Sequence, residues 1–573
     1  MAIGLGSAAE MRRGTDRFGE LTERGSADSL GRVSLDPDSL SQDSLNSVSL
    51  NSVPLDPGSL DPADWPGFRR QAHSMLDDML DYLENIRERP VWQPIPGKVR
   101  ARFSGRLPTA PTNLAQVHEE FLTGILPYTA GNAHPGFMGW VHGGGTPAGM
   151  LAEMLAAATN ANVGGRDQAP VEVERQVARW MRDLFEFPES ASGLFVTGTS
   201  MANLIAMLVA RDAALGLEVR SGGIANQSTK LTAYASREVH GSIGRALDLA
   251  GLGNKALRLI ESDHHRRMEL GALSDAIAMD RRAGYTPFFA VGTAGTVDTG
   301  AVDDLEGVAD ICRREKLWFH VDGAYGALAM LAPELRPRLR GIQRADSLAF
   351  DFHKWGQVPY DAGFILVRDG ELQRQAFASP AAYLARETRG LAAGSPWPCD
   401  FGPDLSRGFR ALKTWFTFKV YGAAAMGAAI AGTCKLARYL ESRVASIPEL
   451  EMMAPVELNI VCFRYRAPDA DQLNRQIAIE LQESGIVAPS TTILDGRVAI
   501  RAAIVNHRTS RAEIDALVEE TLWTGRNLCA RRMEHRKAEL PAERSTEVTG
   551  RGAEVLLAMA ANTGAESPQR GCA

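Results

Sequence analysis

The feature that most constrains the fold of this chain is an alternation of short apolar segments with longer helical ones. The apolar segments predict β-strands at residues 194–197, 231–236, 288–293, 317–322 and 347–352. This rhythm is typical of an α/β fold, in which a large, mainly parallel sheet carries helices on both faces. A ligand of such a sheet binds beyond the carboxyl ends of the strands, so residues that follow these strands are the candidates for a functional site.

The segments before this core predict a tail and a helical arm. Residues 1–60 include a repeated Ser-Leu-Asp/Asn theme of single leucines among polar and proline positions. Such a segment buries too little apolar surface to offset its ordering entropy, and we expect it to be disordered. Residues 61–115 begin with Phe68, Met75, Met79 and Leu83 at helical spacing, which predicts an amphipathic helix that ends before Pro90.

The remaining segments predict a large domain, a small domain and a second tail. We expect the large domain at residues 116–430, with a long helical region at 405–446. A strand at 458–465, a helix at 471–484 and a strand at 497–504 predict a C-terminal α+β domain at residues 431–528. Residues 529–573 are Arg-rich and then rich in Gly, Ala and Ser, which predicts a helical extension that runs into disorder.

Composition and cysteine spacing argue against several classes of function. The 62 Lys and Arg residues against 69 Asp and Glu residues give a net charge of -7, so we expect no nucleic-acid partner. The six cysteines lie far apart without a CxxC pair, so we expect no metal site and a reducing compartment. No apolar run reaches about 18 residues and no signal peptide is recognisable, which predicts a cytoplasmic protein without a membrane partner.

Hydroxyl and histidine residues follow the first two predicted strands. Thr199 and Ser200 lie where a helix begins, and such a turn lets backbone N–H groups and hydroxyls approach a phosphate. A helix cap without a ligand would have the same sequence. His240 follows the strand at 231–236, where an imidazole can stack on a planar ring, reach a substrate carboxylate or cap the next helix.

An aspartate and a lysine follow two later strands. Asp322 ends the strand at 317–322, and a buried carboxylate there needs a cationic partner such as a protonated pyridine nitrogen, unless it caps a helix. Lys354 follows the strand at 347–352 and is either a solvated lysine or the amine of a Schiff base. A phosphate turn, a histidine, an aspartate and a lysine thus occur in this order, each at the carboxyl end of a predicted strand, which independent structural roles would not produce.

These residues resemble the group II pyridoxal-phosphate decarboxylases, which include aromatic-amino-acid, glutamate, cysteine-sulfinate and diaminobutyrate decarboxylases. The similarity runs from about residue 61 to residue 528 and rests on two motifs, HVDGAYG at 320–326 and HKW at 353–355. The resemblance implies the aspartate-aminotransferase-like fold type I and pyridoxal 5′-phosphate as cofactor. It also implies a homodimer with active sites at the subunit interface.

The resemblance implies a role for each motif residue around the cofactor ring. Lys354 would form the Schiff base with the cofactor, Asp322 would hold the pyridine nitrogen, and Ala324 would pack on the ring. His240 matches the histidine that stacks on the other face of the ring.

Further residues match the phosphate site and a mobile loop of the family. Thr199 and Ser200 match the phosphate-binding turn, and His353 lies beside the cofactor lysine. Residues 376–384 resemble the loop whose tyrosine, here Tyr383, returns a proton to the substrate carbon after carbon dioxide has left.

The chain departs from the family pattern at several positions. Asp351-Phe352 replaces the common Asn-Pro before His-Lys, and Gly323 stands where Ala is usual, so both changes affect cofactor contacts. Residues 134–140, HPGFMGW, resemble a substrate-pocket strand, although aromatic residues in such a segment are more often part of a core. Three glycines of the same pocket segment, at 143–145, remove side chains that would define the shape of the substrate.

The resemblance predicts decarboxylation of an L-amino acid to its amine, with a weak preference for aromatic substrates. The same scaffold also supports an aminotransferase or a carbon–carbon lyase, which product analysis would distinguish. A binding protein that keeps the fold and has lost the chemistry is a third reading, which cofactor content would decide.

Overall fold

The computed structural model describes residues 59–379 and 386–539. Residues 1–58 and 540–573 of the two predicted tails, and Tyr383, therefore lie outside the described residues, whereas residues 529–539 of the second tail are helical, as part of α14 (Arg511–Glu539). Within the described chain, residues 59–74 and 111–116 form a small unit, and residues 75–110 and 117–539 form a larger one. The helix expected from the spacing of Phe68 to Leu83 is α1 (Trp65–Glu84), which ends before Pro90 as expected.

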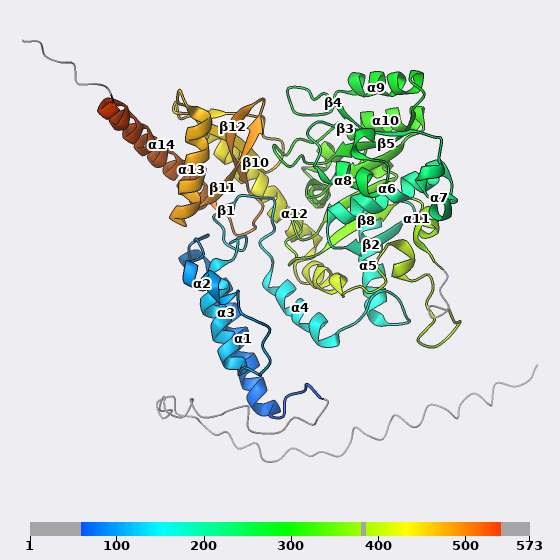
Figure 1. The fold of residues 1–573 in the computed structure, drawn as a ribbon, viewed down its shortest axis with the longest axis horizontal. Helices are drawn as coiled ribbons and strands as arrows, with labels where there is room; N and C mark the ends of the chain where they lie inside the picture. Colours follow the sequence, from blue (N-terminus) through cyan, green and yellow to red (C-terminus); the bar gives the residue numbers. More distant parts are fainter. Residues whose placement is uncertain (1–58, 380–385, 540–573) are drawn as a thin grey trace, which may run out of the picture. The chain divides into compact units, whose positions relative to one another are not determined.

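The larger unit contains a seven-stranded sheet of order β2-β8-β7-β6-β5-β3-β4. All five strands predicted for it are present: β2 (Ser192–Val196), β3 (Leu231–Ser236), β5 (Thr286–Thr293), β6 (Trp318–Asp322) and β7 (Ser347–Asp351). The sequence did not predict β4 (Leu257–Ile260) or β8 (Gly363–Val367). Strand β8 runs antiparallel to β2 and β7, whereas the other neighbours run parallel. The predicted α/β fold with a mainly parallel sheet is confirmed (Figure 1).

Side chains of the sheet alternate between two apolar cores, because successive residues of a strand point to opposite faces. Phe364 and Leu366 of β8 belong to the core that includes α5 (Ala169–Leu184), α9 (Leu270–Arg282) and α10 (Leu305–Glu315). Ile365 and Val367 of β8 belong to the core that includes α6 (Thr199–Leu215) and α8 (Ser242–Leu249). A strand covered on both faces is apolar at every position, as β8 is.

Five more α-helices lie before residue 410 in the described chain. They are α2 (Gly97–Arg102), α3 (Leu114–Gly124), α4 (Pro147–Thr159), α7 (Val219–Gly222) and α11 (Gly370–Phe377).

Helix α12 (Arg410–Ala445), expected at 405–446, connects the large sheet to the C-terminal region. It packs against α4, α5 and α14 (Arg511–Glu539). It is kinked at Gly422, whose φ of 76° is a conformation that favours glycine. Among the described residues, α12 is the one helix that is long and apolar enough to cross a membrane, and a third of its most apolar window is buried.

The C-terminal region has a second sheet of order β1-β11-β12-β10-β9. The predicted elements are present as β10 (Ile460–Tyr465), α13 (Ala470–Ser484) and β12 (Arg497–Ala503). Three strands were not predicted in this sheet: β1 (Phe137–Met138), β9 (Leu450–Met452) and β11 (Ala488–Leu494). Strand β1 pairs with β11. The residues that follow β1 border the cavity at the carboxyl ends of the parallel strands of the large sheet.

Candidate active site

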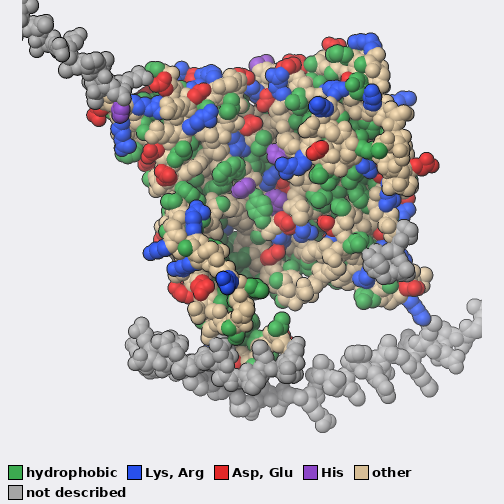
Figure 2. Space-filling view, viewed as in Figure 1, with side chains coloured by type: hydrophobic (Ala, Val, Ile, Leu, Met, Phe, Trp, Pro, Cys, Tyr) green, Lys and Arg blue, Asp and Glu red, His purple; other side chains and the backbone are tan. Residues whose placement is uncertain are grey.

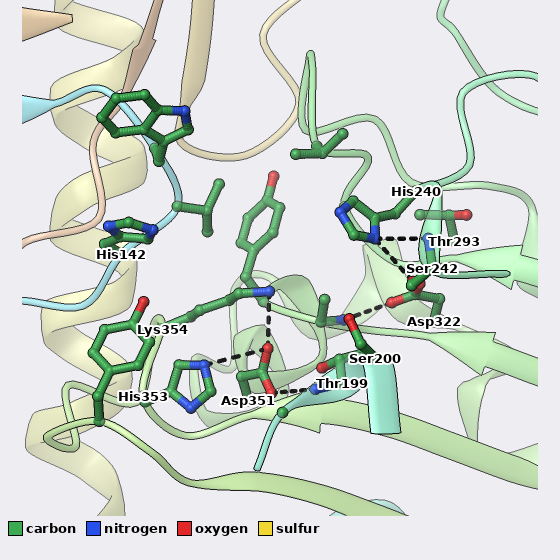
Figure 3. A pocket seen from close by; sticks show the side chains of 18 of the residues that line it. His142, Thr199, Ser200, His240, Ser242, Thr293, Asp322, Asp351, His353 and Lys354 are labelled. Atoms are coloured by element: carbon green, nitrogen blue, oxygen red, sulfur yellow. Dashed lines mark hydrogen bonds and ion pairs between the residues drawn. The ribbon is translucent and has the colours of Figure 1, made fainter. Parts of the chain in front are cut away.

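A cavity of about 360 Å³ lies at the carboxyl ends of the parallel strands, as the doubly wound topology leads one to expect. Histidine and hydrophobic side chains gather near the middle of the face shown in Figure 2. The large sheet contributes the side that carries the sequence motifs, and the segment after β1 together with β12 contributes the other side. Predicted site residues that line the cavity are Thr199, Ser200, His240, Asp322, Ala324, His353 and Lys354 (Figure 3).

These seven residues thus share one cavity, and their individual roles stay predictions. Tyr383, predicted as the proton donor, lies outside the described residues.

Lys354 extends into the cavity from the turn that follows β7. Its Nζ atom lies 2.8 Å from Oδ2 of Asp351, the last residue of that strand. The backbone of Gly143 passes directly behind: its N–H donates to the carbonyl of His353 at 3.1 Å, and a Cβ atom at Gly143 would lie 2.4 Å from the carbonyl oxygen of Lys354. Glycine at this position therefore permits close packing against the lysine backbone. The sequence analysis had interpreted this glycine only as the loss of a side chain that would shape the pocket.

Asp322 is held in a fixed orientation at the end of β6. Its side chain is 2% exposed, and its two oxygens accept hydrogen bonds from Nδ2 of Asn203 at 3.0 Å and from the N–H of Ala324 at 3.1 Å. Burial raises the pKa of Asp322, and the Lys354 cation together with these hydrogen bonds opposes that rise. A buried carboxylate in this state favours a cationic partner in the cavity.

Behind Asp322 lies a hydrogen-bond network that the sequence analysis missed. Oδ1 of Asn203 is 2.9 Å from Nε2 of His320, and Nδ1 of His320 is 2.8 Å from Oγ of Ser347. Burial lowers the pKa of His320 to about 3, so the imidazole is neutral at physiological pH. Asn203 follows Thr199 by four residues on α6, and this helical spacing places both on one face of the helix. An amide among the apolar residues 201–210 of this helix was the available signal.

The first turn of α6 carries a hydroxyl that fits an anionic group. Oγ1 of Thr199 is buried, and within residues 59–379 and 386–539 it has no hydrogen-bond partner. The same holds for Oγ1 of Thr293 in the cavity wall, and Ser200 is exposed there. A buried hydroxyl is normally paired, so an unpaired one at a helix N-terminus fits a phosphate. With the amine of Lys354 and the carboxylate of Asp322 in the same cavity, the residues fit pyridoxal 5′-phosphate.

The two predicted histidines lie in different parts of the cavity. His240 precedes α8, and its Nδ1 atom is 2.8 Å from Oγ of Ser242. Nδ1 of His353 accepts a hydrogen bond of 2.9 Å from the N–H of Ala362, and its ring centroid lies 4.3 Å from that of Tyr360. Burial lowers the pKa of His353, which favours the neutral ring.

An aromatic wall on the β1 side of the cavity was only partly foreseen. We define it as Trp140, His142 and Tyr360; the ring of His142 stacks on Trp140 at 6.1 Å and contacts Tyr360 edge-on at 5.7 Å. Phe137, which stacks on His142 from behind, is buried in a small core instead of lining the cavity. The contributions of His142 and Tyr360 were not predicted, because they come from segments far apart in the sequence.

Comparison with known proteins agrees with the geometry of the site. Residues 96–466 match the family model described as the pyridoxal-dependent decarboxylase conserved domain. An aromatic-L-amino-acid decarboxylase of Bacillus atrophaeus is 33% identical over 470 residues, which is 79% of this chain and 95% of that protein.

Solved structures agree as well. The structure of Oryza sativa TDC with PLP and tryptamine has a TM-score of 0.75 at 25% identity and covers 82% of this chain and 100% of its own. Tryptophan decarboxylase of Catharanthus roseus in complex with L-tryptophan has a TM-score of 0.73 at 26% identity, with the same coverage of both chains.

Proposed function

We propose that this chain, which belongs to the pyridoxal-dependent decarboxylase family, takes aromatic L-amino acids as its substrates. The chain is a lyase: with pyridoxal 5′-phosphate as cofactor it converts an amino acid to an amine and carbon dioxide. The aromatic preference is the part that we propose.

Four residues of the cavity and Tyr383, which lies outside the described residues, would each contribute to this reaction. When bound, pyridoxal 5′-phosphate supplies an electron sink for the bond that breaks. Lys354 would hold the cofactor through its amine, and Asp322 would keep positive charge at the pyridine nitrogen. Thr199 and Ser200 would hold the phosphate at the N-terminus of α6. Tyr383 would return a proton to the substrate carbon after carbon dioxide has left.

The aromatic wall is the observation that carries the proposed specificity. Trp140, His142 and Tyr360 present ring faces and edges to the cavity, and aromatic rings pack favourably on one another in offset or edge-on arrangements. The names of the relatives above, an aromatic-L-amino-acid decarboxylase and tryptophan decarboxylases, support the same preference.

A panel of L-amino acids tests this specificity. We expect tryptophan, tyrosine and phenylalanine to release carbon dioxide with higher kcat/KM than glutamate, cysteine sulfinate and diaminobutyrate. The variant Trp140→Ala should raise KM for the aromatic substrates by about tenfold, since an aromatic contact of this kind adds roughly 0.5–1.5 kcal/mol to the burial of the ring. A preference for an acidic or basic substrate in the unmutated protein would refute the proposal.

Arg501 favours a second candidate, an acidic amino acid. Its buried guanidinium borders the cavity and donates to neutral acceptors, the carbonyls of Val297 and Gly139 and the hydroxyl of Ser490. A substrate carboxylate would complement this charge. Because the α-carboxylate of any amino acid could fill this role, Arg501 does not by itself require an acidic side chain.

We also propose that the protein is a homodimer with active sites at the subunit interface. Leu151, Met154 and Leu155 on α4 are exposed, and so are Val420 and Tyr421 on α12, which packs against α4. Trp140 and Tyr360 of the aromatic wall are 54% and 47% exposed. An apolar surface next to a partly open cavity is typical of an interface that a second copy covers.

We further propose that the enzyme works in the cytoplasm on a small-molecule substrate, without a nucleic-acid or membrane partner. The support is that five cysteines in the described part of the chain are free thiols, which a reducing compartment preserves. Fractionation of cells that express the full chain would test this, and recovery of the activity in the membrane fraction would contradict it.

A further inference from the structure

The carboxylate of Asp351 connects two groups that line the cavity. Oδ2 lies 2.8 Å from Nζ of Lys354, and Oδ1 accepts a hydrogen bond of 2.7 Å from the backbone N–H of Thr199, in the first turn of α6. The side chain is only 3% exposed. The lysine charge, the N–H group and the helix dipole together stabilise a carboxylate this deeply buried. Figure 3 shows Asp351 between these two partners.

The two closest partners of Asp351 are groups that the cofactor needs, and Nε2 of His353 lies farther away, 3.6 Å from Oδ2. The amine of Lys354 attacks a carbonyl carbon only when it is released from its ion pair and has lost its proton. The N–H of Thr199 belongs to the helix N-terminus where the residues fit a phosphate. A phosphate there would lie close to the carboxylate of Asp351, and two negative charges repel strongly where water is excluded.

We propose that Asp351 is a positioning residue that stabilises the cofactor-free arrangement of the site and thereby weakens binding of pyridoxal 5′-phosphate. Its carboxylate takes the place of the phosphate at the N-terminus of α6 and pairs with the lysine, so the cofactor displaces it from both. Asp351 is also a position at which the sequence departs from the family's common Asn-Pro. The inference rests on the cofactor and not on the substrate, so it can fail while the aromatic specificity holds, and the reverse.

The variant Asp351→Asn tests this inference because it keeps the shape of the side chain and an acceptor for the Thr199 N–H while removing the charge. The dissociation constant of pyridoxal 5′-phosphate is measured by titrating the full chain after its cofactor has been removed. We expect the variant to bind at least about tenfold more tightly, since relief of repulsion between two nearby charges in a protein exceeds that factor. General damage to the site would weaken cofactor binding. A gain in affinity would therefore indicate the loss of charge repulsion and not such damage.

Asp346→Asn is the matched control. Asp346 precedes the same strand at its opposite end, where it accepts a hydrogen bond of 2.7 Å from the N–H of Phe319. This variant removes the same charge far from the cavity and should bind the cofactor as the unmutated chain does. An equal gain in both variants would overturn the inference, and so would an affinity of Asp351→Asn that is unchanged or lower.

A second measurement tests the competition with the phosphate separately from the pairing with the lysine. Pyridoxamine 5′-phosphate has no carbonyl, so its binding reports the phosphate arm without a bond to the lysine. We compare Lys354→Ala with the double variant Lys354→Ala/Asp351→Asn and expect the double variant to bind this compound about tenfold more tightly. Equal affinities would overturn the claim that Asp351 competes with the phosphate.

Discussion

At the scale of single residues, the orientation of Asp322 depends on a neutral histidine two residues before it. His320 and Asp322 are alternate residues of β6, so both side chains lie on the same face of the sheet, and Asn203 joins them. Because the histidine is neutral, the positive charge that balances Asp322 is left to a group in the cavity. The network thus favours a cationic ring nitrogen as the partner of Asp322.

His320 should also make the stability of the protein depend on pH. Burial lowers its pKa from 6.5 to about 3, so between these values the unfolded chain binds a proton that the folded chain does not. The folded protein therefore loses stability as the pH falls below 6.5. Between pH 7 and pH 5 the loss from this residue is about 2 kcal/mol.

Urea unfolding of His320→Gln at pH 7 and pH 5 measures this contribution. We expect the free energy of unfolding of the variant to fall by about 2 kcal/mol less than that of the unmutated protein. His73→Gln, on an exposed part of α1, should behave as the unmutated protein does. An equal loss in all three proteins would show that His320 does not titrate in this way.

The sequence predicted those site residues whose position depends only on the end of a single strand. Asp322 and Lys354 each follow an apolar strand, so their position at the cavity edge follows from local sequence. The contact of Asp351 with Thr199 joins residues 152 positions apart, and the contact of His320 with Asn203 joins residues 117 apart. Such pairs depend on how α6 packs across the sheet, which a single sequence does not determine.

At the scale of elements, the predicted strands are also those that local sequence identifies, whereas the missed strands depend on their place in the sheet. Strands β5, β6 and β7 are central and covered on both faces, so they form apolar runs that the sequence displays clearly. Strand β4 is at the edge of the sheet, with an exposed Leu259 and a half-buried Arg258, and its pattern is correspondingly weak. Strand β8 is apolar throughout, but it pairs antiparallel after a short connection and therefore breaks the alternation with helices on which the prediction depended.

The outcome of the reaction is predicted to depend on the segment at 376–384, of which Ala376 and Phe377 end helix α11 and residues 380–384 lie outside the described residues. Replacement of Tyr383 by Phe removes the proposed proton donor and keeps the ring. We expect the rate of amine formation to fall about a hundredfold, the usual scale of general acid catalysis, with some oxidative deamination by dissolved dioxygen in its place. Amine, aldehyde and ammonia are quantified together.

Tyr285→Phe is the control for this loss of a hydroxyl. Tyr285 precedes β5 at the end of the sheet opposite the cavity, where Arg258 lies over its ring. Its removal should leave the amine rate unchanged. An unchanged rate and product in Tyr383→Phe would refute the role of the loop.

At the scale of the whole molecule, the proposed dimer explains why the aromatic wall is half exposed in one chain. A second copy that covers α4 would also close the cavity near Trp140 and exclude water from the site. We expect Met154→Glu, which places a charge on the exposed face of α4, to shift the protein toward monomer and to lower its specific activity. Sedimentation at several concentrations measures the first effect, with the dissociation constant of the dimer raised about tenfold or more.

Met279→Glu on α9 is the matched control for this change. Met279 is 60% exposed, against 50% for Met154, and it lies on α9, which packs against β4, β5 and α10. This variant should sediment as the unmutated protein does. A fully active monomer of the unmutated chain would refute the proposed dimer.

Binding of the cofactor by Lys354 in this cavity is the premise of every role proposed for the site. Reduction of the purified enzyme with borohydride, followed by peptide mass analysis, locates the lysine that carries the cofactor. We predict a single modified peptide that contains Lys354 and no modified peptide in Lys354→Ala. Attachment to any other lysine, such as Lys413 on α12, or a modified peptide that persists in the variant, would contradict the account.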